Sequence, residues 1–451
     1  MERMREYDGK TVLVLGLGRS GVAAARLLAE SGARPVCADE RRAGPVEGLP
    51  DGVESRLGPF EPALLTGVDE VVVSPGVGAD HAVFAATRKR GVPVIGELEL
   101  AFRFAEAPVI AVTGTNGKST TVSMIGAILA EDGRETVVAG NVGVPFSSVV
   151  RSIGSDGFLV IEVSSFQLET IDRFHPRSAG VLNMTPDHLD RYPRLEEYYE
   201  AKERIIEPLG PGDVFFYNAD DERCAALAAR TGAATVPFSV NRPVPEGVFL
   251  DRRHLIRVLP GGTEEIFIER DELAVVGLHN VENALAAVAA LSGTGVAADS
   301  CRRALSRFTG LPHRMERVAE IGGVTFYNDS KATNVEAAVR SLEGLDSPVV
   351  LIAGGRDKGG DFTKLLGLSG VVRRIVTIGE AAGPIEKAVG SVIPCTMAGT
   401  MCEAVREAGG AASPGWLVVL SPACASFDMF DDFEHRGREF RRCVGEEAAQ
   451  R

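Results

Sequence analysis

Val109-Ile-Ala-Val-Thr-Gly-Thr-Asn-Gly-Lys-Ser-Thr120 is the stretch that decides the fold of this chain. The apolar, β-branched residues from Val109 to Val112 predict a buried strand, and the segment from Thr121 to Ala130 has a helical period. Between them lies a glycine-rich loop that ends in Lys118-Ser-Thr120. A strand, such a loop and a helix in that order are typical of a phosphate-binding loop at the carboxyl edge of a parallel sheet.

The loop has the residue types that a nucleoside triphosphate requires. Successive backbone N–H groups can point at phosphate oxygens, Lys118 supplies a positive charge, and the hydroxyl of Ser119 can bind Mg2+. Val112 stands where the usual pattern has its first glycine, so the loop is a variant of that pattern. We predict that it binds ATP, with a turn that serves only the fold as the alternative; the residues are Gly114, Thr115, Asn116, Gly117, Lys118, Ser119 and Thr120.

A single acid stands in the next apolar run, Phe158-Leu-Val-Ile-Glu-Val163. A carboxylate in a buried strand is costly unless it has a partner. Mg2+ held by the loop hydroxyl would be such a partner, which makes Glu162 the first metal candidate. The alternative is an acid that is merely hydrogen-bonded at the end of its strand.

Short apolar runs alternate with helical segments along the whole chain, which predicts an α/β protein with parallel sheets. The chain divides into three expected domains: residues 1–97, 98–310 and 311–451. Residues 236–275, with several Pro and Gly, give no clear prediction. The other runs that predict strands are Thr11–Leu15, Val71–Val73, Val349–Ile352 and Leu417–Leu420.

A second glycine motif, Gly16-Leu-Gly18-Arg-Ser-Gly21, follows the first predicted strand and opens a predicted helix. Asp39 ends the next short strand. This pattern is found where a pyrophosphate meets a helix N-terminus and an acid binds a ribose or a base edge. The motif alone is compatible with three roles: binding of a nicotinamide dinucleotide, binding of a UDP-type nucleotide, or only close packing of the helix on the strand. The turn at Ser74-Pro-Gly76 is either a further ligand contact at the same edge or a plain turn.

Composition narrows the class of protein. The formal charge of −14 over 451 residues disfavours a general binder of nucleic acid or membrane surfaces. We find neither an apolar leader at Met1–Asp8 nor an apolar run of membrane-spanning length, so we expect a cytoplasmic protein. The seven cysteines are scattered without a C-x-x-C pair, and we expect ordinary reduced thiols.

Five spaced segments together resemble the Mur ligase family. They are Thr113–Thr120, Glu162-Val-Ser-Ser-Phe-Gln167, Asn183-Met-Thr-Pro-Asp-His-Leu-Asp-Arg-Tyr192, Gly277-Leu-His-Asn-Val-Glu-Asn283 and Asn328-Asp-Ser-Lys-Ala-Thr-Asn334. The resemblance covers nearly the whole chain. Within the family, Ser421–Phe433 and Arg436–Phe440 are most similar to the members that add D-glutamate.

The resemblance implies three domains: an N-terminal Rossmann-like domain for the UDP end of the substrate, a central P-loop ATPase-like domain with a parallel sheet, and a C-terminal Rossmann-like domain for the amino acid. It implies an ATP- and Mg2+-dependent amide ligase that adds D-glutamate to UDP-N-acetylmuramoyl-L-alanine in peptidoglycan precursor synthesis. The reaction would pass through an acyl-phosphate and a tetrahedral intermediate. A monomer with small-molecule substrates and two Mg2+ sites is expected.

The resemblance also assigns residues to sites. Lys118, Glu162, His188 and Lys202 would be catalytic; Ser119, Glu162, His188 and a Lys202 carbamylated by CO2 would hold Mg2+. Asn280, Arg314 and Asp329 would complete the ATP site. The UDP substrate would contact Gly18, Ser20, Asp39, Ser74, Gly76, Asn141, Gln167 and His188. D-Glutamate would contact Lys331, Thr333, Lys358, Ser426 and Phe433.

Other interpretations remain open for the residues taken singly. A loop histidine such as His188 is often only solvated, a lysine such as Lys202 in an amphipathic stretch is often a solvated helix lysine, and Phe433 could be core packing. The whole chain could also be another Mur ligase or a folylpolyglutamate synthase-like ligase. An NAD-dependent dehydrogenase that uses Gly16–Gly21, or a nucleotide sensor without turnover, are the alternatives from other classes.

Overall fold

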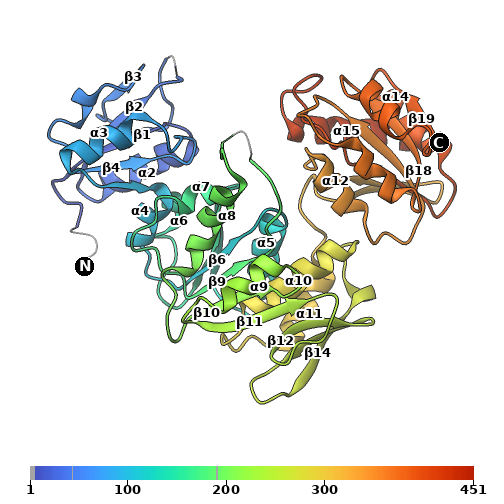
Figure 1. Ribbon diagram of the computed structural model, residues 1–451, viewed down its shortest axis with the longest axis horizontal. Helices are drawn as coiled ribbons and strands as arrows, with labels where there is room; N and C mark the ends of the chain where they lie inside the picture. The colour runs from blue at the N-terminus through green and yellow to red at the C-terminus, as the bar shows by residue number, and fades with distance from the viewer. Residues whose placement is uncertain (1–5, 43, 189–190, 451) are drawn as a thin grey trace. The chain divides into compact units, whose positions relative to one another are not determined.

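A computed structural model describes residues 6–42, 44–188 and 191–450. These residues form two compact units, Met1–Glu269 with Asn283–Leu305, and Arg270–Glu282 with Ser306–Arg451. The chain passes between the units three times: after β14 (Glu264–Glu269), within α10 (Leu278–Ala290) and within α11 (Ala298–Arg307). The strands form three mostly parallel sheets with helices between them along the chain (Figure 1), which confirms the predicted α/β class.

The first sheet is parallel throughout, in the order β3-β2-β1-β4-β5. Side chains of β1 alternate between its faces: Val12 and Val14 pack with helices α2 and α4, whereas Leu13 and Leu15 pack toward α3. A strand buried on both faces reads as a continuous apolar run. The elements are β1 (Thr11–Leu15), α2 (Arg19–Glu30), β2 (Arg34–Asp39), β3 (Ser55–Leu57), η1 (Pro62–Leu65), β4 (Glu70–Val73), α3 (Ala82–Arg90), β5 (Val94–Gly96) and α4 (Glu97–Arg103).

The central sheet has the order β14-β13-β12-β11-β10-β9-β6-β8-β7. It is parallel from β7 to β12, and the poorly readable residues 236–275 supply the antiparallel strands β13 and β14. Its elements are β6 (Val109–Thr113), α5 (Lys118–Glu131), β7 (Thr136–Gly140), α6 (Phe146–Val149), β8 (Phe158–Glu162), α7 (Ser165–Leu168), β9 (Ser178–Val181), α8 (Leu195–Glu203), η2 (Arg204–Ile206), β10 (Val214–Asn218), α9 (Glu222–Ala228), β11 (Ala234–Ser239), β12 (Gly247–Asp251), β13 (His254–Val258), β14 (Glu264–Glu269) and η3 (Arg270–Glu272).

The third sheet, in the second unit, has the order β15-β16-β20-β17-β18-β19, and only β15 and β16 pair antiparallel. Val350 and Ile352 of β17 pack toward α14 and α15, and Val349 and Leu351 pack toward α12 and α13. The elements are β15 (Glu316–Ile321), β16 (Val324–Asn328), α12 (Val335–Leu342), β17 (Val349–Gly354), η4 (Phe362–Leu368), β18 (Val372–Ile378), α13 (Ala382–Val389), β19 (Cys395–Met397), α14 (Met401–Ala411), β20 (Leu417–Leu420) and α15 (Phe433–Gln450).

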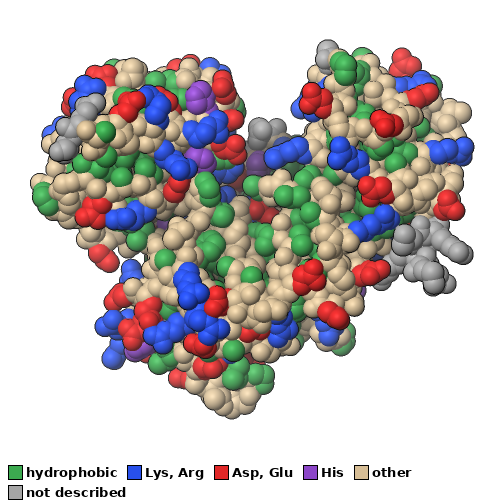
Figure 2. Space-filling view, turned by 180° about the vertical axis from the view of Figure 1, so that it is seen from behind, with side chains coloured by type: hydrophobic (Ala, Val, Ile, Leu, Met, Phe, Trp, Pro, Cys, Tyr) green, Lys and Arg blue, Asp and Glu red, His purple; other side chains and the backbone are tan. Residues whose placement is uncertain are grey.

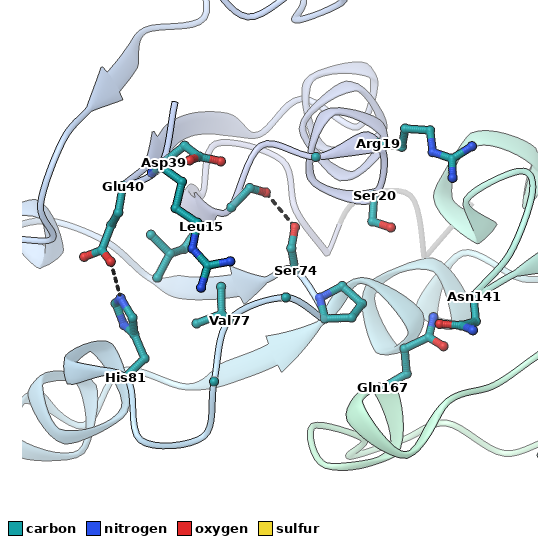
Figure 3. A pocket seen from close by; sticks show the side chains of 16 residues that line it. Leu15, Arg19, Ser20, Asp39, Glu40, Ser74, Val77, His81, Asn141 and Gln167 are labelled. Carbon is teal, nitrogen blue, oxygen red and sulfur yellow. Dashed lines mark hydrogen bonds and ion pairs between the residues drawn. The ribbon is translucent and has the colours of Figure 1, made fainter. Parts of the chain in front are cut away.

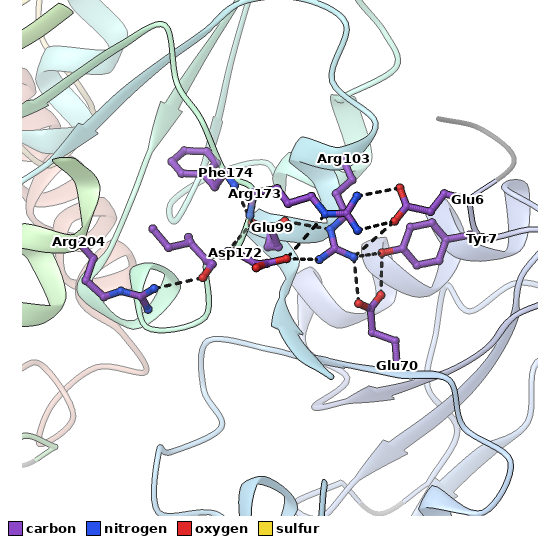
Figure 4. A network of polar contacts seen from close by, with 10 residues as sticks. Glu6, Tyr7, Glu70, Glu99, Arg103, Asp172, Arg173, Phe174 and Arg204 are labelled. Carbon is purple, nitrogen blue, oxygen red and sulfur yellow. Dashed lines mark hydrogen bonds and ion pairs between the residues drawn. The ribbon is translucent and has the colours of Figure 1, made fainter. Parts of the chain in front are cut away.

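A buried ionic network joins the first sheet to the central part of the first unit (Figure 4). Arg103 donates to Glu70 at 2.9 Å, to Glu99 at 2.9 Å and to the hydroxyl of Tyr7 at 3.0 Å. The second oxygen of Glu99 accepts the backbone N–H groups of residues 172–174 at 2.8–3.0 Å. Each of these buried charges therefore has a partner of opposite charge, and Glu99 links the network to the backbone of residues 172–174.

A disulfide joins Cys402 of α14 to Cys443 of α15, with a Cα–Cα distance of 4.9 Å. The expectation that all seven cysteines are reduced thiols is therefore wrong for this pair. The two residues are 41 positions apart, and they meet because α14 and α15 pack side by side on one face of the third sheet. Cys37, Cys224, Cys301, Cys395 and Cys424 are free thiols, as expected.

Acidic and basic side chains lie among one another on the face of the molecule seen in Figure 2. No helix within residues 6–42, 44–188 and 191–450 combines the length and the apolar character that a membrane crossing requires.

Candidate active site

The loop after β6 has the backbone form that a phosphate-binding loop requires. Gly114 and Gly117 have φ of 144° and 88°, a region that residues with a Cβ rarely adopt. A Cβ on Gly117 would lie 2.4 Å from the side-chain oxygen of Asn283, so close packing excludes one as well. Helix α5 begins at Lys118, directly after the loop, and its first N–H groups face the space above the loop.

Hydrogen bonds from Asn183, which follows strand β9, hold this loop in place. Its side chain accepts the N–H of Asn116 at 2.8 Å and donates to the carbonyl of Asn116 at 3.1 Å, while its carbonyl accepts the N–H of Thr115 at 3.0 Å. The hydroxyl of Thr115 lies 3.0 Å from that of Tyr198 in α8. The loop is thereby held in one conformation before any ligand binds, which reduces the entropy lost on binding.

Two lysines converge on the same loop. The Nζ of Lys118 donates to the carbonyls of Gly114 at 2.7 Å and Thr115 at 2.8 Å, and the Nζ of Lys202 donates to Gly114 at 3.0 Å. Lys202 is only 2% exposed. Burial, and then the charge of Lys118, lower the pKa of Lys202 well below its usual value. A lysine in this position spends more time as a neutral amine than an exposed one does.

Glu162 ends β8 beside the loop. Its strand pairs with β6 so that Glu162 lies opposite Val112, and the residue is 2% exposed. Asn141 donates to one of its oxygens at 3.0 Å. The hydroxyl of Thr113 is buried with no hydrogen-bond partner among the residues that the structure describes. A carboxylate, the Ser119 hydroxyl and an unsatisfied threonine oxygen are hard oxygen donors, and such a set fits Mg2+.

His188 lies in the loop after β9, near the same edge. Its ring packs against Phe166 with centroids 4.9 Å apart and lies 6.1 Å from the ring of Tyr198. The side chain is 46% exposed, and its backbone φ of 54° is in the left-handed region. A non-glycine residue in that region is strained, and such strain often accompanies function. The Tyr198 ring is thus near both side chains, with the Nζ of Lys202 4.7 Å from its centroid.

A cleft of about 360 Å3 lies between the first sheet and the central part of the first unit (Figure 3). Its lining includes most of the residues predicted to bind the UDP substrate: Gly18, Ser20, Asp39, Ser74, Gly76, Asn141 and Gln167. His188 does not line this cleft. Glu40, Arg41 and His81 do, and sequence reasoning did not single them out.

Asp39 organises the floor of the cleft. Its two oxygens accept the backbone N–H groups of Leu17 at 2.6 Å, Arg41 at 2.9 Å and Arg42 at 3.0 Å. Burial raises the pKa of Asp39, but these hydrogen bonds outweigh it and leave the pKa below its usual value. Asp39 is therefore ionised at neutral pH, and its hydrogen bond to the N–H of Leu17 holds the backbone of the glycine loop.

The glycine loop and the Ser74 turn are built against each other. Ser74 donates its hydroxyl to the carbonyl of Gly16 at 2.6 Å. A Cβ on Gly21 would lie 1.9 Å from that carbonyl oxygen, so only glycine allows α2 to begin this close to the loop. The two predicted turns therefore form one wall of the cleft.

In the second unit, Lys331 and Phe433, two of the residues predicted to contact D-glutamate, lie against each other. The Nζ of Lys331 lies 3.7 Å from the centroid of the Phe433 ring. Arg436 is fully buried and donates to Ser330 and Cys424 at 2.8–3.0 Å, while Ser330 donates to the carbonyl of Phe433 at 2.8 Å. Burial lowers the pKa of Arg436 to about 10. Arg436 thus anchors the start of α15 to the segment after β16.

The other predicted residues of the second unit are distributed as follows. Thr333 is partly exposed just before α12, Lys358 is exposed in the loop after β17, and Ser426 is 2% exposed after β20. Asn280 is buried in α10 and donates to the carbonyl of Val276 at 2.8 Å. Arg314 lies just before β15, and its positive charge acts to lower the pKa of Asp329.

Three family models match the chain in order. "Mur ligase MurD-like, N-terminal domain" matches residues 10–96, "Mur ligase middle domain" matches residues 112–291, and "Mur ligase, glutamate ligase domain" matches residues 313–424. The chain belongs to the Mur ligase family. The resemblance stated from the motifs is thereby confirmed, and the dehydrogenase alternative for Gly16–Gly21 loses its support.

Full-length relatives agree with the family models. The chain of this Mur ligase is 44% identical to the UDP-N-acetylmuramoylalanine--D-glutamate ligase of Acidobacterium capsulatum, over 97% of each chain. It is also 44% identical to the protein of that name from Anaeromyxobacter dehalogenans, over 98% of this chain and 99% of the relative.

Solved structures support the fold. A pseudomurein peptide ligase type C from Methanothermus fervidus has a TM-score of 0.60 at 18% identity, over 97% of this chain and 100% of its own. MurF from Acinetobacter baumannii has a TM-score of 0.59 at 19% identity, over 98% and 92%.

Several residues that shape the sites of this Mur ligase had no role in the sequence analysis. Asn183 and Asn283 lay inside quoted motifs, so a signal for them existed, although their contacts with the phosphate loop could not be seen. Ser330 likewise lay inside a quoted motif. Tyr198 and His81 gave no such signal, because the partners of their side chains at the sites are distant in the sequence.

Asp329 yields a test of pH dependence. Burial raises its pKa to about 6, although hydrogen bonds from Ser341, Ser421 and Met315 oppose the rise. Because the folded state holds this proton more tightly than the unfolded state does, the unfolding free energy falls as the pH rises from about 4 to about 6. Over that window the unfolding free energy of the wild type should fall by about 3 kcal/mol relative to that of Asp329→Asn, at about 1.4 kcal/mol per pKa unit.

Urea unfolding of both proteins at a series of pH values measures this difference. The second unit contains Asp329, so tryptophan fluorescence from Trp416 of the same unit is a suitable signal. Unfolding free energies that stay parallel for the two proteins across the window would contradict the assignment.

Proposed function

We propose that the protein is an ATP-dependent ligase that joins D-glutamate to UDP-N-acetylmuramoyl-L-alanine in peptidoglycan precursor synthesis. The observation that carries the proposal is the full-length identity of 40–44% to relatives named for that reaction. The loop that holds Lys118 and Lys202 beside Glu162 supports it independently, because acyl-phosphate formation needs a triphosphate held where a carboxylate can reach it.

In this proposal each domain takes one substrate. Residues 1–97 hold the UDP end in the cleft of Figure 3, residues 98–310 hold ATP, and residues 311–451 hold the amino acid. The donors of the first cleft are backbone N–H groups at the start of α2 and the hydroxyl of Ser20, which suit a diphosphate. Asn280, Arg314 and Asp329 would complete the ATP site.

The first chemical step brings two anions together, the substrate carboxylate and the γ-phosphate. Lys118 offsets part of their repulsion, and the N–H groups at the start of α5 bind the phosphates. Ser119 and Glu162 would hold one Mg2+, and His188 with a modified Lys202 would hold a second. When bound, Mg2+ neutralises the charge that develops on the phosphoryl oxygens.

The second step is attack of the amine of D-glutamate on the acyl-phosphate. Lys331 would bind a carboxylate of the amino acid, with Phe433 covering its alkyl chain. Thr333, Lys358 and Ser426 would supply further donors. We also infer that the enzyme works as a monomer in the cytoplasm, where ATP and the UDP-linked precursor are available.

The substrate assignment is tested by phosphate release. Purified protein with Mg-ATP and UDP-N-acetylmuramoyl-L-alanine is offered D-glutamate, L-glutamate, L-alanine, L-lysine and meso-diaminopimelate in turn. We expect phosphate release with D-glutamate to be at least ten times faster than with any other amino acid. Only a dicarboxylate of this length and of the D configuration would meet the donors of the second unit. Release that requires another amino acid would point to another Mur ligase, and release with a folate in place of the UDP compound to a folylpolyglutamate synthase-like ligase.

A second test concerns Lys202. Addition of an amine to CO2 needs the neutral form, and burial of Lys202 favours that form. A carbamate would place a carboxylate where the unmodified lysine would repel a metal ion. We expect Lys202→Ala to lose more than about 99% of kcat and to regain part of it with millimolar acetate or propionate, which return a carboxylate to the vacated space.

Lys364→Ala is the matched control, because that lysine is exposed and pairs only with Glu336 in the described part of the chain. It should keep wild-type activity with or without added carboxylate. A Lys202→Ala enzyme of normal activity, or one that short carboxylates inhibit as they do the wild type, would refute the carbamate.

A further inference from the structure

We propose that Arg191 is a positioning residue for the UDP cleft. It joins the turn at residues 74–77 to the loop that carries His188. Occupancy of the cleft therefore depends on the same side chain as the geometry of the catalytic edge, by which we mean the edge of the central sheet that carries the phosphate loop, Glu162 and His188. The inference rests on the proposed function, because it takes the 360 Å3 cleft as the site of the UDP substrate.

Arg191 reaches across from the central part of the first unit to the turn. Its Nη1 donates to the carbonyl of Pro75 at 2.9 Å, and its Nη2 donates to the carbonyl of Val77 at 3.2 Å. Pro75 and Val77 both line the cleft. The same turn carries Ser74, whose hydroxyl holds the carbonyl of Gly16. Arg191 therefore fixes one wall of the cleft through two backbone carbonyls and, through Ser74, the glycine loop.

Contacts on the other side fix Arg191 itself. Its Nη2 pairs with Glu169 at 3.1 Å, and its guanidinium lies 3.9 Å from the centroid of the Phe166 ring. Tyr192 donates to the second oxygen of Glu169 at 2.5 Å. The side chains of Arg191 and Glu169 are 17% and 20% exposed, so solvent screens this pair little.

The link to the catalytic edge runs through the same residues. The Phe166 ring that lies under the guanidinium also packs against the His188 ring, with centroids 4.9 Å apart. The backbone N–H groups of Arg191 and Tyr192 donate to the carbonyl of His188 at 3.0 and 3.1 Å. A shift of Arg191 would therefore move both the Ser74 turn and His188.

Only arginine has the chemistry for this position. Its planar guanidinium presents several donors in a fixed geometry and can stack on an aromatic ring at the same time. A lysine at the same place keeps the charge, but one ammonium cannot stack on Phe166 while it donates to two carbonyls and a carboxylate. Arg191→Lys is therefore the informative substitution, since it removes the geometry and keeps the charge.

The chain offers a matched control in Arg134. This arginine of the first unit also donates to a backbone carbonyl, that of Thr294 at 3.0 Å, pairs with an acid, Asp132, at 3.1 Å, and lies over an aromatic ring, that of Phe158. It does not line the cleft. Arg134→Lys thus reports the general cost of replacing an arginine with such contacts, without a change at the Ser74 turn.

The experiment measures binding of UDP and, separately, of Mg-ATP by calorimetry to full-length wild type, Arg191→Lys, Arg191→Ala and Arg134→Lys. Steady-state phosphate release supplies kcat and KM for the UDP substrate. We expect the Kd of UDP to rise about tenfold in both Arg191 variants, the size expected for loss of one hydrogen bond to a charged group. The Kd of Mg-ATP should change less than about twofold, and KM for the UDP substrate should rise with a smaller fall in kcat.

Three results would overturn the inference. They are a UDP affinity of Arg191→Lys within about twofold of the wild type, an equal or larger loss of Mg-ATP affinity, and an equal loss of UDP affinity in Arg134→Lys, since each would mark a merely structural arginine. Because Arg191→Lys keeps size and charge, a failure of Arg191→Ala to fold does not prevent the test. Wild-type protein that does not bind UDP would overturn the proposed function, and this inference with it.

Discussion

The pairing of β6 with β8 and β9 is the constraint on which the site depends. Parallel strands end at one edge, so this pairing brings the glycine loop after β6, Glu162 at the end of β8 and Asn183 just after β9 to the same place. Asn183 then fixes the loop, and the loop carbonyls hold both lysines. A shift of register by one residue would turn Glu162 to the opposite face of the sheet.

Close approach of other groups to the backbone is the second constraint, and it explains where glycine is needed. Gly117 lies against the Asn283 side chain, and Gly21 lies against the carbonyl of Gly16. At both places a helix begins directly over a loop, and its free N–H groups point toward the space in which a phosphate would lie. The two glycine motifs are thus the same arrangement of loop and helix used twice, and in the proposed function each would face one anionic substrate.

Sequence reasoning reached the parts of the molecule that local patterns encode. The runs at Val109–Val112 and Val349–Ile352 were readable as strands because helices bury both faces of these sheets. The strands β13 and β14 were not, since their region is rich in turn residues and only partly buried. The Cys402–Cys443 bond was misjudged, because the packing of α14 on α15 that brings the sulfurs together leaves no local pattern. The clamp of Arg191 on the Ser74 turn joins residues more than a hundred positions apart and was likewise invisible.

The central claim is that the loop bearing Lys118 grips the triphosphate of ATP with Mg2+. Calorimetric titration of Mg-ATP into the wild type and into Lys118→Ala, with UDP binding as the control for folding, tests it most directly. The account predicts binding to the wild type and a loss of about tenfold to a hundredfold in the variant, since a hydrogen bond between two charged groups is lost, with UDP affinity unchanged. Equal Mg-ATP affinity in the two proteins, or no Mg2+-dependent binding to the wild type, would contradict it.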